Sequence, residues 1–111
     1  MMLRWVSGAV LIGIAAGAGA QAMTVPPELW DRPRSGRAVL EQPVIRKAVH
    51  AYLAQPSARI VIHHAATQDG LLQAEELLAW LIALAVEKER IALRGGLKSA
   101  DPINIEVVSV P

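Results

Sequence analysis

Cysteine is absent from this 111-residue sequence. The chain therefore cannot form a disulfide, and it cannot be a lipoprotein anchored through a cysteine. It also lacks an excess of one charge, since its formal net charge is only +1. A mixed, nearly neutral charge pattern gives no basic stripe for nucleic acid or for anionic lipid. The uncharged run from Leu77 to Val86, in the second half of the chain, is too short to cross a bilayer.

The N-terminus has the three parts of a secretory signal. A basic start, MMLR, precedes an uncharged stretch from Trp5 to Ala20, and Ala20-Gln21-Ala22 forms a small-residue cleavage motif. We therefore predict export, with cleavage after Ala22, and a signal peptide over residues 1–22. A retained membrane anchor is the alternative. After cleavage no membrane span is expected.

Residues 23–36 are rich in proline and charge, with Pro26-Pro27, Pro33 and one aromatic residue, Trp30. Proline has no N–H to donate to a β-ladder, so this segment does not suit a central strand. We predict an extended lead-in that packs its tryptophan onto a domain formed by residues 37–111.

The first helix is predicted to begin at Pro43, where the missing N–H of proline costs nothing, and to stop at Gln55-Pro56-Ser57. Its apolar residues recur at helical spacing; they are Ile45, Val49, Tyr52 and Leu53. The β-branched run within Arg59 to His64 predicts an inner strand beside a helix layer.

A second helix is predicted from Gly70 or Leu71 to about Lys88, with Asp69 at or near its N-cap. Ile91 to Leu93 predicts a short strand, Arg94-Gly95-Gly96 a turn, and Ile103 to Val110 a final strand. This order predicts a two-layer α/β sandwich, of the α+β type, with helices on one face of a small mixed sheet.

The segment ARIVIHHAATQDG, residues 58–70, follows a helix and a Pro-Ser turn and precedes a second helix. SGRAVLEQP precedes this segment, and QAEELLAWL, ERIALRG and DPINIEV follow it. In this order the pieces resemble the C-terminal OmpA-like domain of Gram-negative envelope proteins. The resemblance covers roughly Ser35 to Val108. It implies an OmpA-like fold, a periplasmic location and binding of the peptide stem of peptidoglycan.

In that family a loop Asp and a helix Arg hold the zwitterionic end of diaminopimelate. The matching positions here hold Ala65-Ala66 and Gln73, so the resemblance implies loss of both charged groups. A carboxylate is best held by a forked guanidinium and an ammonium by an acid, so this loss weakens binding of the family kind. Four residues remain as candidate ligand-loop residues, and these are His64, Asp69, Gln73 and Arg94.

The adjacent histidines His63 and His64 raise two other kinds of site, a metal site and a catalytic site. Neighbours in a strand point to opposite faces, so a metal site would need Asp69, Glu75 or His50 to converge with one of them. The simpler expectation is that His63 packs at the strand end while His64 faces solvent or the loop. Neither a nucleophile elbow nor a phosphate-binding glycine loop accompanies Thr67, so no catalysis and no cofactor are expected.

We therefore predict an exported, non-catalytic cell-envelope module that docks on another envelope protein. The alternative is a peptidoglycan-binding domain with an altered loop, and a metal-dependent or hydrolytic periplasmic enzyme is a third class. Glu75-Glu76 is expected to lie on a solvated helix face, and Trp80 is expected to anchor the core.

Overall fold

A four-stranded mixed sheet forms one layer of the protein in a computed structural model, which describes residues 20–109. Its strands lie in the order β1 (Ala20–Thr24), β4 (Asn104–Val108), β2 (Arg59–Ala65) and β3 (Ile91–Leu97). β4 pairs antiparallel with both β1 and β2, and β2 pairs parallel with β3. The two late strands of the sequence therefore do not pair with each other.

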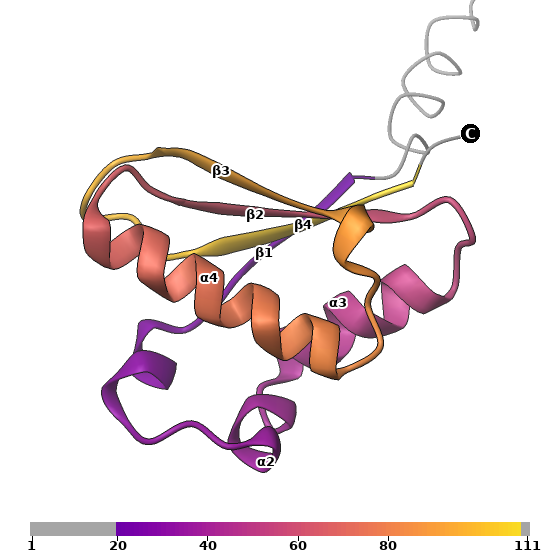
Figure 1. The fold of residues 1–111 in the computed structure, drawn as a ribbon, viewed down its shortest axis with the longest axis horizontal. Coiled ribbons are helices and arrows are strands. Elements are labelled where there is room, and N and C mark those ends of the chain that lie inside the picture. The colour runs from indigo at the N-terminus through magenta and orange to yellow at the C-terminus, as the bar shows by residue number, and fades with distance from the viewer. Residues whose placement is uncertain (1–19, 110–111) are drawn as a thin grey trace, which may run out of the picture.

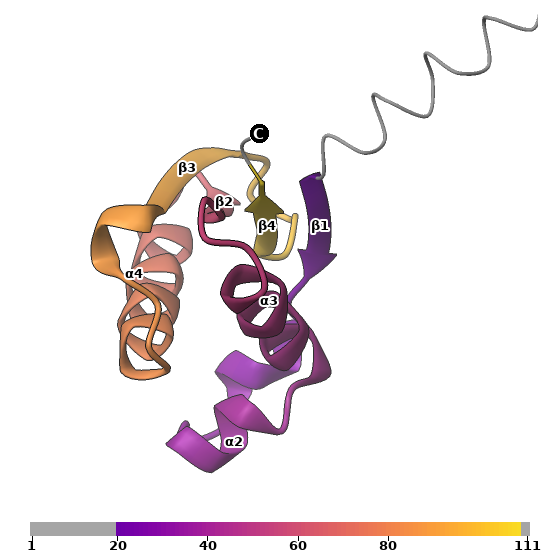
Figure 2. The same ribbon diagram turned by 90° about the vertical axis from the view of Figure 1, so that its right-hand side faces the viewer.

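Helices form the second layer, and the two longest of them lie on the same face of the sheet (Figure 1, Figure 2). These are α3 (Pro43–Leu53) and α4 (Gln68–Ala83). A short helix α2 (Gly36–Leu40) and a 3-10 turn η1 (Pro27–Asp31) lead into α3, and a second turn η2 (Lys88–Arg90) leads into β3. The predicted α+β two-layer architecture is thus confirmed at this level.

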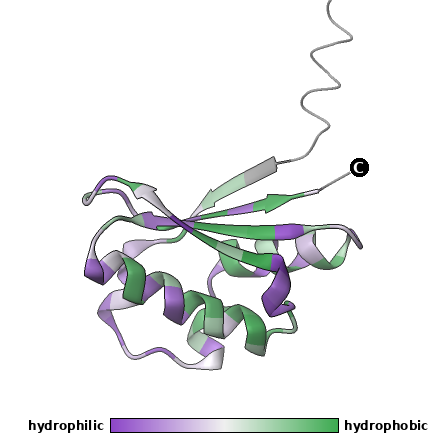
Figure 3. Cartoon of the chain, turned by 45° about the horizontal axis from the view of Figure 1, so that its top comes forward, coloured by the Kyte–Doolittle hydropathy of each residue, from purple (hydrophilic) through white to green (hydrophobic). Residues whose placement is uncertain are grey.

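Strand alternation accounts for the core between the layers. Ile60 and Ile62 of β2 are fully buried, as is Ile105 of β4, and they meet Leu77 and Leu81 of α4. The intervening strand residues point to the uncovered face, because successive side chains alternate across a sheet. Hydrophobic colour accordingly follows the central strands and the second half of α4 (Figure 3).

The first predicted helix and strand are confirmed almost to the residue. Pro43 occupies the first turn of α3, which ends at Leu53, just before the Pro-Ser turn, and β2 extends one residue past its expected end, to Ala65. The assignment of Leu53 to the apolar face was wrong, because its side chain is 62 % exposed. Ala48 takes its place on the buried face.

The predicted lead-in packs closely against the domain. Val25 and Leu29 are buried in the core, and Trp30 packs at its border. The segment begins with the end of the edge strand β1 and is not extended throughout, because Pro27–Asp31 form the 3-10 turn η1.

Both ends of the second helix differ from the prediction. Thr67 is the N-cap, because its side chain accepts a hydrogen bond from the N–H of Gly70 at 3.0 Å, and Asp69 lies inside the first turn. The helix ends at Ala83 because Ala85 adopts a left-handed conformation with φ of 81°. The N–H of Val86 then donates to the carbonyl of Leu81, which is a Schellman closure.

The expected turn at Arg94-Gly95-Gly96 is wrong, because these residues continue β3 to Leu97. The chain turns later, where the N–H of Asp101 donates to the carbonyl of Lys98 and the Asp101 carboxylate accepts from the N–H of Lys98. The final strand covers Asn104–Val108, and Val110 lies outside the described residues. Most of the predicted signal peptide, residues 1–19, lies outside them as well.

Replacing Ala85 by glycine is expected to stabilise the protein. A left-handed conformation costs an L-residue about 1 kcal/mol that glycine does not lose, so Ala85→Gly should raise the free energy of unfolding by up to this amount. Urea denaturation followed by tryptophan fluorescence measures the change. The matched control is Ala79→Gly on the exposed side of α4, which should lower stability by about 0.5–1 kcal/mol. A destabilised Ala85→Gly variant would contradict the assigned helix end.

Candidate functional site

Two adjoining hollows lie where β2 ends and β4 begins. One encloses about 220 Å³ and the other about 240 Å³, and both are bordered by Gln73, Asp101 and Ile103. We call them together the loop groove. Its remaining lining residues come from η1, from the end of β2, from the start of α4 and from the connection before β4; they are Pro27, Trp30, Asp31, Ala65, Thr67, Asp69, Gly70, Ser99, Ala100 and Pro102.

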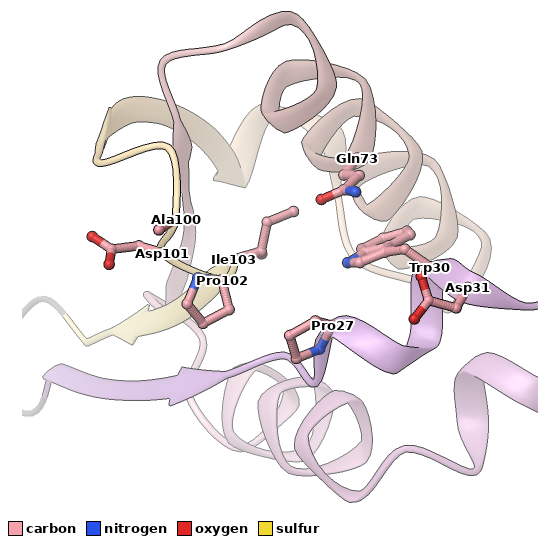
Figure 4. Close-up of a pocket in the computed structure, with 8 residues that line it drawn as sticks. All are labelled: Pro27, Trp30, Asp31, Gln73, Ala100, Asp101, Pro102 and Ile103. Atoms are coloured by element: carbon pink, nitrogen blue, oxygen red, sulfur yellow. The ribbon is translucent and has the colours of Figure 1, made fainter.

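The local fold explains why these segments meet. Gly70 lets α4 start directly against the end of β2, because a Cβ at this position would lie 2.5 Å from the carbonyl oxygen of Ala65. The first turns of α4 therefore bring Asp69 and Gln73 beside the connection that carries Asp101. Trp30 and Pro27 of η1 close the opposite side (Figure 4).

Carboxylates are the only charged groups on the groove lining. Asp69 and Asp101 border one hollow, and Asp31 and Asp101 border the other, while neither is lined by a lysine or an arginine of the described chain. The groove could accept an ammonium group, but it offers no guanidinium fork for a carboxylate. Of the four candidate ligand-loop residues, the structure brings together Asp69 and Gln73.

His64 lies elsewhere, and the expectation that it faces solvent or the loop was wrong. Its side chain is buried on the helix side of β2, with Nδ1 at 2.8 Å from the carbonyl oxygen of Ala65. Since a carbonyl only accepts, Nδ1 carries the hydrogen. A Cβ on Gly95 would lie 3.0 Å from the ring, so glycine in β3 makes room for this histidine.

His63 and Arg94 share the uncovered face of the sheet. His63 pairs in register with Arg94, and its Nε2 lies 2.8 Å from an Oε1 of Glu106 on β4. The prediction that the two histidines point to opposite faces is therefore confirmed. Arg94 is exposed on that face and does not line the loop groove, so it supplies no cation there.

Sequence reasoning missed a cluster that fastens the lead-in to α4. Arg34 donates through Nε and NH2 to the two carboxylate oxygens of Glu76, at 2.7 and 2.8 Å. The indole N–H of Trp80 donates to the same carboxylate, and the guanidinium lies 5.6 Å from the ring centre of Trp30. We call these four residues the Arg34 cluster. Glu76 is thus a paired, half-buried residue rather than a solvated one.

No linear signal identifies this cluster, because Arg34 and Glu76 are 42 positions apart. Only the spacing of Glu76 and Trp80, one helical turn, was visible in the sequence. The cluster holds Trp30 at the side of the loop groove and so fixes one of its walls. Asp101 and Ser99 were missed for the same reason, since only the fold brings their connection to α4.

Residues 20–109 contain no group of three or more His, Asp or Glu side chains arranged to hold a metal ion. In particular His50 is exposed on α3, and pairs with neither histidine of β2. Within the same range no helix has both the length and the hydrophobicity of a membrane span.

The outward side of α4 is unusually apolar. Leu72 is 54 % exposed, and Leu71 and Ile82 are each 40 % exposed. With the exposed Ala79 and Ala83, these residues cover roughly a third of the helix circumference. We call this surface the α4 face, and Glu75 is the charged residue within it.

Comparisons of the chain with protein-family models, with curated proteins and with solved structures each return no match.

The ion pair in the Arg34 cluster should make stability depend on acid pH. The Arg34 hydrogen bonds lower the pKa of Glu76 below its ordinary value. A group with a lowered folded-state pKa contributes fully above its unfolded pKa and loses that contribution as pH falls through the folded-state pKa. Glu76→Gln should therefore lower the melting temperature by a few degrees at neutral pH, and the difference from the wild type should shrink as pH falls below 4–5.

The readout is tryptophan fluorescence during thermal unfolding, since Trp30 and Trp80 both lie in the cluster. Glu75→Gln is the matched control, because Glu75 is the exposed neighbour on the same helix. Its melting temperature should follow that of the wild type at every pH. A Glu76→Gln variant with wild-type stability at neutral pH would contradict the role assigned to the pair.

Proposed function

We propose that the protein is an exported, non-catalytic module of the cell envelope that docks on another envelope protein through the α4 face. The α4 face carries the proposal. A helix that packs only on its own sheet is expected to be polar on its solvent side. Here that side presents leucine and isoleucine instead, and exposed apolar surface of this kind marks interaction sites.

The loop groove supports docking over binding of the peptidoglycan stem. A zwitterionic ligand end needs a cation for its carboxylate as well as an acid for its ammonium. Asp69, Asp101 and Asp31 supply acids, but none of the described residues that line the groove is a lysine or an arginine. Loss of one member of such a charge pair costs about 2–5 kcal/mol of binding free energy. Because about 1.4 kcal/mol corresponds to a tenfold change in affinity, a groove without the cation should bind the peptide stem far more weakly.

The OmpA-like scaffold remains part of the proposal. It is supported by the order of helix, strand, helix, strand and strand over residues 43–108, with one strand before them and the long helices on one sheet face. A peptidoglycan-binding domain with an altered loop is the second candidate function. The observation that favours it is the meeting of Asp69 and Gln73 in one hollow at the end of β2.

Site-specific photo-cross-linking tests the docking proposal. A photoreactive residue at Ala79, in the centre of the α4 face, should give a discrete protein adduct in intact cells. The same residue at Ala54, an exposed alanine that follows α3, should not. Leu72→Ser and Ile82→Ser should each reduce the Ala79 adduct several-fold, because they remove apolar area from the interface.

Leu53→Ser is the control substitution, since Leu53 is the most exposed large apolar residue described and lies on α3. It should leave the Ala79 adduct unchanged. Equal adducts from Ala79 and Ala54, or no adduct from either, would argue against docking through α4.

A further inference from the structure

Strand β1 spans the cleavage point that the sequence suggested. Its residues pair with β4 in a continuous register: Ala20 with Val108, Gln21 with Val107, and Ala22 with Glu106, followed by Met23 with Ile105 and Thr24 with Asn104. Cleavage after Ala22 would remove the first three of these five partners. Only Met23 and Thr24 would remain of the strand.

That loss would open the sheet at one of its inner strands. β4 lies between β1 and β2, so the backbone of Glu106, Val107 and Val108 would change from a paired to a free edge. Free edge groups lose their hydrogen-bond partners and provide a template for unwanted pairing with other chains. The side chain of Val107 is 3 % exposed and belongs to the core, so the opening would lie directly beside buried residues.

The sequence offers a second cleavage motif upstream of β1. Ala16-Gly17-Ala18 has the same small-x-small pattern as Ala20-Gln21-Ala22. It also lies closer to the apolar part of the signal, because Ile14 is the last large apolar residue before either motif. The stretch from Trp5 to Ile14 has the length of a normal apolar signal region, about 7–15 residues.

We infer that the signal is cleaved after Ala18, so that the exported protein begins at Gly19 and retains the whole of β1. This inference rests on the proposed export. The intermediate motif, Ala18-Gly19-Ala20, would remove the first residue of β1 and its pairing with Val108. Of the three motifs, the first is the one that leaves every pair of the β1–β4 ladder in place.

Intact-mass spectrometry of the full chain, expressed with its own N-terminus in a Gram-negative host, tests the inference. The periplasmic fraction should contain one main species whose mass corresponds to residues 19–111. A main species that starts at Gln21 or Met23 would overturn the cleavage site while leaving export intact. Unprocessed chain in the cytoplasm would overturn both the inferred cleavage and the proposed export. Unprocessed chain in the membrane fraction would overturn the inferred cleavage after Ala18.

Two matched substitutions sharpen the test. Ala18→Leu places a large residue directly before the inferred cut, and it should abolish the species that begins at Gly19. Ala22→Leu does the same at the other motif, and its side chain is exposed on β1, so the sheet can accept it. This variant should still begin at Gly19. Loss of processing in Ala22→Leu, with normal processing in Ala18→Leu, would assign the cut to Ala22.

Discussion

One constraint organises this protein: within residues 20–109, the helices cover a single face of the sheet (Figure 2). The buried isoleucines of β2 and β4 point to that face, and α3 and α4 lie against it and exclude water. Ile60, Ile62 and Ile105 are therefore fully buried beneath the two helices. The contact of α4 with the sheet fixes the position of its first turn. This turn lies against the C-terminal end of β2 and beside the connection between β3 and β4. The position of the loop groove is a consequence of core packing.

The same constraint leaves α4 with an outward side, and there the sequence is unexpectedly apolar. Polar residues would satisfy the core equally well, so packing within the domain does not explain Leu72 or Ile82. The Arg34 cluster binds the neighbouring lead-in to α4. Arg34 of the lead-in forms a bidentate ion pair with Glu76 of α4, and the indole N–H of Trp80 donates to the same carboxylate. The groove wall and the border of the α4 face are thus both anchored to one helix.

Much of the fold could be predicted from sequence because its signals are local. Pro43 begins α3, the Pro-Ser turn ends it, and the β-branched run forms β2. The errors arose where local preference yields to the fold. Gly95 suggested a turn but lies in a strand, where its missing side chain accommodates the buried ring of His64. Ala85 carries no helix-stop signal, yet it adopts the left-handed conformation that closes α4.

The candidate site was predicted less well, because it depends on contacts between distant segments. Asp69 and Gln73 are four positions apart on one helix, and the sequence could place them together. Asp31 and Asp101 join them only through the fold, and so does Arg34 with Glu76. Arg94 was a candidate cation for the loop because it stands at the end of the predicted third strand, but the register places it with His63 on the uncovered face of the sheet.

We propose that the loop groove does not hold the peptidoglycan stem, because the described residues that line it include carboxylates but no lysine or arginine. Co-sedimentation of the purified protein with isolated sacculi tests it most directly. The account predicts that wild type and the Asp69→Ala variant both stay in the supernatant to the same extent at physiological salt. Salt-resistant co-sedimentation of the wild type that is lost in Asp69→Ala would contradict it.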